Sequence, residues 1–145
     1  MHTPDPRKHR GDFAEGIAIS FLKKKKFVIL STNYRYRAGE IDIIAYDKEK
    51  KELVFVEVRS KWYEKVAENW RRESIVPEDT VNRVKLKKIE KTAWLFLEKE
   101  PEKWQCYFKR LPIYSFPEWR IDLISVSIEQ SSCKIQIRHY KYLYV

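Results

Sequence analysis

The stretch that decides the fold runs from residue 39 to residue 61 and reads GEIDIIAYDKEKKELVFVEVRSK. Two apolar runs, Ile41 to Tyr46 and Leu53 to Val58, are β-branched or aromatic at most positions and flank a polar connector. Runs of this kind predict the two strands of a hairpin. Each run carries one acid where a buried strand favours an apolar side chain, namely Asp42 and Glu57.

These two acids are expected to meet. Side chains alternate across a strand, so pairing through the connector places the carboxylates of Asp42 and Glu57 side by side, with Arg59 and Lys61 beyond them on the same face. Two adjacent carboxylates repel unless a proton or a cation lies between them. Mg²⁺, which proteins bind through one or two carboxylates with water and phosphate, satisfies this arrangement. The alternative is an ordinary ion pair between each acid and a neighbouring arginine or lysine.

The spacing of these residues resembles a known signature. Asp42 followed by Glu57-Val58-Arg59 is similar to the D…(D/E)-x-K pattern of the PD-(D/E)xK nuclease superfamily, which includes restriction endonucleases and archaeal Holliday-junction resolvases. A longer pattern over about residues 8 to 127 resembles the YraN family of uncharacterised proteins. Its pieces are Gly11, Glu15, Ala18, Asn33-Tyr34-Arg35, Gly39-Glu40-Ile41-Asp42, Val54-Phe55-Val56-Glu57-Val58-Arg59, Ala93 and Arg120-Ile121-Asp122.

The resemblance implies a fold and a site. The fold would be an α/β, restriction-endonuclease-like domain over residues 1–145, with a central mixed β-sheet of about five strands flanked by two main helices and an insertion at 101–117. Asp42 and Glu57 would bind one or two Mg²⁺ or Mn²⁺ ions with the backbone carbonyl of Val58. Glu15 would be a third carboxylate reaching from the first helix. A capping box between Asp12 and Glu15 is an equally open interpretation of that residue.

Arg59 departs from the superfamily pattern, which has lysine at this position. An arginine stays protonated, so Arg59 cannot act as a general base, although it can bind the scissile phosphate. Lys61 could supply an amine if the strand extends that far. The catalytic set is therefore expected to be Glu15, Asp42, Glu57 and Arg59, in a metal-dependent endonuclease acting on branched or single-stranded DNA. Two alternatives are a nucleic-acid-binding module that does not cut and an interaction protein without a nucleic-acid role.

Composition favours an anionic partner. The 145 residues include 30 Lys and Arg against 21 Asp and Glu, a formal net charge of +9. This balance points to nucleic acid ahead of a membrane surface, and the resemblance to nucleases implies DNA. No apolar run approaches the roughly 18 residues of a membrane span. Cys106 and Cys133 lack metal-ligand spacing, so we expect free thiols and a cytoplasmic location. Whether two chains pair as a homodimer stays open.

Further cations surround the predicted site in the sequence. Arg35 and Arg37 precede the acids, and Arg83, Lys87 and Lys91 recur every four residues along the predicted second helix. Like charges at this spacing weaken an isolated helix by a few tenths of a kcal/mol each, roughly. An anion facing the stripe explains that cost, and a solvated face is the alternative. We therefore assign these residues, with Lys61, to nucleic-acid binding.

The remaining elements follow from periodicity and breakers. A Pro at the first helical position, after Thr3 or Asp5, could open a helix ahead of the amphipathic stretch from 12 to 26. Gly39 is predicted to meet a backbone requirement such as a positive φ. Val81, Val84, Ile89, Ala93, Phe96 and Leu97 are predicted as the buried side of the second helix. The expected segments are a strand at 27–36 broken at 31–33, a loop from 62 to 78, a helix from 77 to about 99, an irregular stretch at 101–117, a half-buried strand at 119–129 and its hairpin partner at 134–144. In the loop, packing of Trp62 and Trp70 on the sheet is the preferred interpretation, and a segment facing nucleic acid is the alternative.

Overall fold

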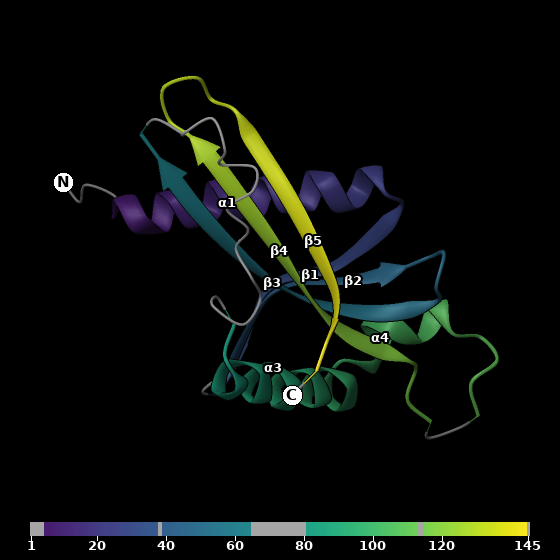
Figure 1. Ribbon diagram of the computed structural model, residues 1–145. Coiled ribbons are helices and arrows are strands. Elements are labelled where there is room, and N and C mark those ends of the chain that lie inside the picture. Colours follow the sequence, from purple (N-terminus) through teal and green to yellow (C-terminus); the bar gives the residue numbers. More distant parts are fainter. Residues whose placement is uncertain (1–4, 38, 65–80, 113–114, 145) are drawn as a thin grey trace.

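A computed structural model describes residues 5–37, 39–64, 81–112 and 115–144 (Figure 1). The elements in these ranges run in the order α1 (Pro6–Lys24), β1 (Phe27–Tyr36), β2 (Gly39–Asp47), β3 (Glu52–Tyr63), α3 (Arg83–Lys99), α4 (Pro101–Trp104), the short 3₁₀ helix η1 (Gln105–Tyr107), β4 (Trp119–Glu129) and β5 (Ile135–Leu143).

The five strands form one sheet in the order β1-β2-β3-β4-β5. β1–β2, β2–β3 and β4–β5 pair antiparallel, whereas β3 and β4 pair parallel. The predicted hairpin is therefore confirmed, with Ile43 opposite Val56 and Asp47 opposite Glu52. The predicted fold class, an α/β fold with a mixed sheet of about five strands and two main helices, is confirmed as well.

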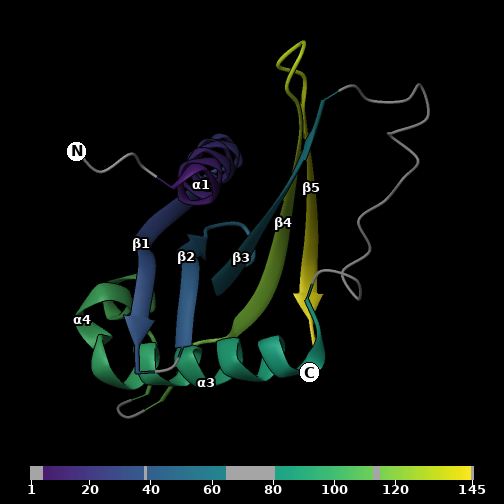
Figure 2. The same cartoon turned by 90° about the vertical axis from the view of Figure 1, so that its left-hand side faces the viewer.

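Two helices cover opposite faces of the sheet (Figure 2). On one face, Ala14, Ala18 and Leu22 of α1 pack on a cluster that includes Ile43 and Val56. The other face carries α3, which packs on a separate cluster of strand residues. Because both faces are covered, β4 is buried along most of its length, and the prediction of a half-buried strand is wrong.

α1 begins earlier than the amphipathic pattern indicated. Asp5 is its N-cap, with a side-chain oxygen accepting from the Arg7 backbone N–H at 3.0 Å, and Pro6 is the first helical residue. The Asp5-Pro6 opening is thus confirmed. Asp12 lies inside the helix instead of at its start, so the alternative of a capping box between Asp12 and Glu15 is wrong.

α3 buries a different side from the one predicted. Asn82 is its N-cap and accepts from the Lys85 backbone N–H at 2.9 Å, so the helix begins at Arg83; the predicted opening at 77–80 lies outside the described residues. Val84, predicted to be buried, is 63% exposed. The buried positions follow a regular helical spacing that leaves Val84 out. They are Leu86, Ile89, Thr92, Ala93, Phe96 and Leu97.

Gly39 meets a packing requirement. No glycine in the described ranges has a positive φ, so the predicted positive φ is wrong. A Cβ at Gly39 would instead lie 1.8 Å from Oγ1 of Thr92, which no side chain tolerates. The absence of a side chain lets the start of β2 approach α3 closely. This contact sets the position of α3 relative to the strand that carries Asp42.

Three further segments differ from the simple sequence pattern. β1 is continuous but its register shifts between Ile29 and Ser31, and Asn33 has φ 52°, close to the predicted break. β3 continues through Trp62 and Tyr63, which were wrongly predicted as loop, because its pairing with β4 extends that far. Trp62 packs on the α1-side cluster, as expected. The remainder of the predicted loop, with Trp70, lies outside the described residues.

The stretch after α3 is more regular than predicted. Residues 101–107 form α4 and η1, and Trp104 is buried with its indole N–H donating to the Leu97 carbonyl at 3.2 Å. That 101–117 is an insertion stays a prediction. Among the helices in the described ranges, none combines the length and apolar character that crossing a membrane requires.

Candidate functional site

Asp42 and Glu57 lie next to each other where β2 and β3 begin to separate. The last β2–β3 pair at this end is Ile43 with Val56, and the two acids come next on their strands. β3 continues beside β4 beyond this point, while the Oδ2 atom of Asp42 accepts a hydrogen bond of 2.8 Å from the Val58 backbone N–H. The two carboxyl groups also interact directly, with Glu57 as the donor. The expected juxtaposition of the two acids is present.

Each acid holds its proton more tightly than usual. Burial, followed by the negative charge of Asp42, raises the pKa of Glu57 to about 7, although the charges of Lys85 and Arg59 oppose the shift. Burial also raises the pKa of Asp42, against the opposing hydrogen bond from Val58. Raised pKa values on neighbouring carboxyl groups mark a place where positive charge is favoured.

Two cations face Glu57. The Nε atom of Arg59 lies 3.3 Å from Glu57 Oε1, and the Nζ atom of Lys85 lies 3.8 Å from the same oxygen. Sequence reasoning missed Lys85. It stands two positions from Arg83 and Lys87, outside the stripe of every fourth residue, and only the packing of α3 brings it to β3.

Glu15 lies on α1 near the β1 bulge. Its Oε2 atom accepts a hydrogen bond of 3.1 Å from the Asn33 side-chain amide. Burial raises the pKa of Glu15, and the negative charge of Asp42 contributes to the shift. In the parts of the chain that the structure describes, no group of three or more His, Cys, Asp or Glu side chains is arranged to hold a metal ion. Glu15 therefore lies within electrostatic reach of Asp42 without completing a three-ligand set.

The other residues assigned to nucleic-acid binding are spread over several elements. Arg35 pairs with Glu40 at 3.2 Å, and Arg37 lies over the Tyr36 ring at 5.5 Å. Lys61 is exposed on β3, four residues beyond Glu57 and therefore about 13 Å along the strand. The stripe residues of α3 are exposed as well: Arg83, Lys87 and Lys91.

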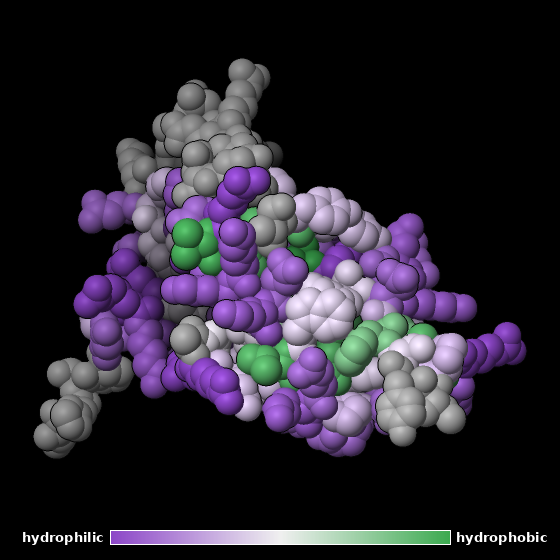
Figure 3. All heavy atoms as spheres, turned by 90° about the horizontal axis from the view of Figure 1, so that it is seen from below, coloured by the Kyte–Doolittle hydropathy of each residue, from purple (hydrophilic) through white to green (hydrophobic). Residues whose placement is uncertain are grey.

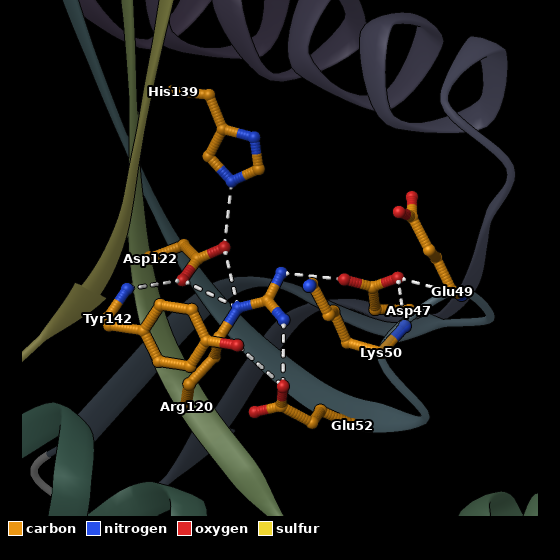
Figure 4. A network of polar contacts seen from close by, with 8 residues as sticks. All are labelled: Asp47, Glu49, Lys50, Glu52, Arg120, Asp122, His139 and Tyr142. Carbon is orange, nitrogen blue, oxygen red and sulfur yellow. Dashed lines mark hydrogen bonds and ion pairs between the residues drawn. The ribbon is translucent and has the colours of Figure 1, made fainter.

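A second group of buried acids lies on the α1 side of the sheet, around Arg120 (Figure 4). The guanidinium donates to Asp122 at 3.0 Å and to Asp47 at 2.9 Å, and lies 3.5 Å from Glu52. His139 Nε2 lies 2.7 Å from Asp122, whose other oxygen accepts from a backbone N–H at 3.1 Å. Arg120 and Asp122 thus pair with each other within a buried network on the sheet.

The fold and this geometry define an α/β protein with a paired-carboxylate site between two strands and a helix. The sequence pattern of the Uncharacterised protein family UPF0102 matches residues 14–126, and the chain belongs to that family.

Sequence similarity to relatives covers much of the chain. It is 42% identical over 90 residues to a UPF0102 protein of Caldicellulosiruptor bescii, covering 62% of this chain and 67% of that one. A UPF0102 protein of Syntrophus aciditrophicus is 32% identical over 127 residues, which is 88% of this chain and 83% of that one. Among solved structures, SfsA of Pyrococcus furiosus in complex with Ca²⁺ has a TM-score of 0.34 at 14% identity, covering 97% of this chain and 66% of that one.

Proposed function

We propose that this protein is a Mg²⁺- or Mn²⁺-dependent endonuclease of the PD-(D/E)xK type that cleaves DNA phosphodiester bonds. The observation that carries the proposal is the adjacency of Asp42 and Glu57, two acids with raised pKa values beside Lys85 and Arg59. A structural ion-pair network would have stabilised the charged forms of both acids. This pair instead disfavours its own negative charge.

The donor set fits a hard divalent cation. Mg²⁺ is commonly bound through one or two carboxylates, with water and substrate phosphate at the remaining positions. Asp42 and Glu57 would hold the ion with the carbonyl of Val58, and Glu15 would act through water. Bound there, the ion would polarise the phosphate and lower the pKa of a water molecule.

Cationic and polar groups on the same face suit the phosphate. Arg59 and Ser125 stand opposite each other on β3 and β4. Within the described residues, Ser125 Oγ is buried and has no hydrogen-bond partner, whereas Arg59 Nε is buried and has an ion-pair partner in Glu57 at 3.3 Å. Buried polar groups of this kind usually meet water, an ion or a ligand. Arg59 would bind a non-bridging phosphate oxygen and stabilise its developing charge.

Lys85 is better placed than Lys61 for the role of the superfamily's lysine. Its amine lies 3.8 Å from Glu57, whereas Lys61 is about 13 Å further along β3. An amine at that distance can orient a water molecule beside the acids and place a positive charge near the leaving oxygen. The departure at Arg59 is therefore compensated by a residue from another element.

The test is cleavage of branched and single-stranded DNA with Mg²⁺ or Mn²⁺, using Asp42→Asn and Glu57→Gln. Each variant should lower the rate at least about 100-fold, since each removes charge from the metal site. Glu49→Gln in the exposed β2–β3 turn is the control and should cut like the wild type. Calorimetric titration of Mg²⁺ should give heat with the wild type and none with Asp42→Asn. Undiminished cleavage in both site variants would remove the assigned site.

A second candidate is a DNA-binding module that keeps the fold without cutting. The feature that favours it is Arg59 in place of the lysine, since a guanidinium cannot accept a proton. This candidate predicts salt-dependent binding of DNA and no cleavage with any divalent metal. Lys85→Met separates the two candidates further, because only the nuclease needs that amine.

A further inference from the structure

A groove lies between the β1–β2 turn and the outer side of α3. Its volume is about 500 Å³, within the range of about 300–1,000 Å³ typical of small-molecule sites. Tyr36, Arg37 and Gly39 line one wall, and about three turns of α3, from Lys88 to Glu98, line the other. The residues that matter for the argument are Tyr36, Arg37, Gly39, Lys88, Lys91 and Trp94.

The charge of the groove fits an anion. Arg37, Lys88 and Lys91 line it, against the single acid Glu98. Arg37 is held over the Tyr36 ring at 5.5 Å, so its guanidinium is positioned before any ligand arrives. A second groove on the other side of the helix is lined by the same two lysines together with Trp94, and Figure 3 shows hydrophobic patches among hydrophilic side chains on this underside of the molecule.

Trp94 offers a fixed aromatic surface. It is 39% exposed although it is among the largest side chains. Phe116 and Trp119 hold it through edge contacts, with ring centroids 5.3 and 5.5 Å away. An aromatic ring that is anchored on some sides and open on another, next to cations, is the arrangement on which unpaired nucleobases stack.

The groove and the candidate site share two elements, α3 and β2. Lys85, which faces Glu57, is followed along α3 by Lys88 and Lys91 at steps of three residues. Six residues of helix rise about 9 Å, a distance that a short segment of one nucleic-acid strand can span. Gly39 in the groove is three residues from Asp42 on the same strand. A nucleic-acid strand can therefore occupy both places at once.

We propose that this groove binds an unpaired nucleotide of the strand that enters the Asp42–Glu57 site, with its base on Trp94 and its phosphate at Lys88, Lys91 and Arg37. The proposal rests on the function proposed above and narrows its substrate. A base can stack on Trp94 only when it is free of its own duplex. The substrate is thus a nucleic acid with a single-stranded segment beside the cleaved bond, not a continuous duplex.

The test measures binding in EDTA, so that no strand is cut. Fluorescence anisotropy of a short labelled single strand is compared with that of the same sequence as a blunt duplex. Wild type should prefer the single strand, and Trp94→Ala should weaken single-strand binding by about tenfold, the effect of one stacked base, while changing duplex binding by less than about twofold. Trp94→Phe keeps a ring in the same aromatic cluster and should restore most of the affinity.

The charge of the groove is tested separately. Lys88→Glu with Lys91→Glu should weaken both probes strongly and flatten the salt dependence. The matched control is Lys23→Glu with Lys24→Glu, the same charge change on exposed residues at the end of α1, and it should weaken binding far less. Equal losses of affinity in the two double variants would mean that binding reflects only general electrostatic attraction to the basic protein, and this would contradict a binding site in the groove.

Three other results decide the proposal. Undiminished single-strand binding by Trp94→Ala, or preference of the wild type for the duplex, overturns it. A wild-type dimer in sedimentation velocity that Trp94→Ala dissociates would make the groove an interface between copies and would also overturn it. If single-strand binding depends on Trp94 but the protein cleaves no substrate, the proposed role of the groove is supported and the proposed nuclease activity is contradicted.

Discussion

Two groups of acids lie on opposite sides of the same sheet, and the pKa values of Glu57 in one and Asp47 in the other are shifted in opposite directions. On the α3 side, Glu57 and Asp42 have raised pKa values. On the α1 side, burial alone would raise the pKa of Asp47, but the Lys50 backbone N–H and Arg120 outweigh it, and the pKa is lowered. One sheet therefore holds a pair of acids, Asp42 and Glu57, in which protonation is favoured, and an aspartate, Asp47, in which the charged form is favoured.

The number of nearby charges alone would predict a lowered pKa for Glu57 and a raised pKa for Asp47. Two acids face two cations at the first group, whereas Arg120 faces three carboxylates at the second. The difference lies in hydrogen-bond donors. Asp47 accepts from two backbone N–H groups and from Arg120, at 3.0, 3.2 and 2.9 Å, while the cations stay 3.3 and 3.8 Å from Glu57. Directed donors, more than nearby charge, keep a buried carboxylate ionised.

The largest effect on stability is expected from Arg120→Met. Removing the guanidinium leaves buried acids without their main partner, so the free energy of unfolding should fall by about 3–5 kcal/mol. Urea unfolding at pH 7 measures this loss. Arg83→Met, at an exposed position of α3, is the control and should change stability by less than about 0.5 kcal/mol. A loss below about 1 kcal/mol for Arg120→Met would contradict the role given to the network.

The next effect comes from Glu57. Its pKa rises from 4.5 to about 7 on folding, so the folded chain binds more protons between these values. The free energy of unfolding of the metal-free protein should therefore decrease as pH rises through this window and level off above it. Glu57→Gln should remove this part of the slope and raise stability at pH 8 by about 3 kcal/mol. Mg²⁺ at pH 8 should stabilise the wild type more than the variant.

Measuring stability against pH also tests the second group of acids, through the lowered pKa of Asp47. The pKa of Asp47 lies below 3.8, so its contribution is present above that pH and is lost as pH falls through the lowered value. Asp47→Asn should weaken the acid-induced loss of stability while leaving the window between pH 4.5 and 7 unchanged. Chemical unfolding at closely spaced pH values separates the two groups, and a shared response would contradict their independence.

A smaller effect is expected at Gly39, which positions α3 over the first group. Gly39→Ala places a methyl group against Thr92 Oγ1, and this overpacking should cost about 1–3 kcal/mol in unfolding free energy. Thr92→Ala in the same chain removes the clashing oxygen and should recover part of the loss. The double-mutant cycle measures this coupling. Simple additivity would mean that the close approach does not set the position of α3.

The smallest stability effect belongs to Lys85→Met. The lysine side chain is 35% exposed, so stability should change by less than about 1 kcal/mol. Its positive charge lowers the pKa of Glu57, so the variant should shift the Glu57 titration, followed by NMR of the side-chain carboxyl carbon, to higher pH. Lys61→Met is the control and should leave the titration in place. An unshifted titration in Lys85→Met would exclude an influence of that lysine on the acids.

Much of the candidate site could be predicted from local sequence. The six-residue connector from Asp47 to Glu52 and the alternation of side chains set the register in which Asp42 meets Glu57. The strand at 119–129 was predicted with the bounds that it has. The start of α1 and the buried side of α3 were less accessible, because a helix limit depends on its cap and a buried side on the surface it meets.

The sequence by itself determined that Asp42 and Glu57 lie on adjacent strands and that the chain is basic. The alternation of side chains along a strand is a local property of the backbone, so it can be predicted from the sequence. Only the tertiary structure decided which partners those acids have. Lys85 reaches Glu57 because Gly39 and Thr92 let α3 lie close to β2, and Arg120 meets Asp47 across strands far apart in sequence. The donors that separate the two groups of acids come from long-range packing, which local pattern does not encode.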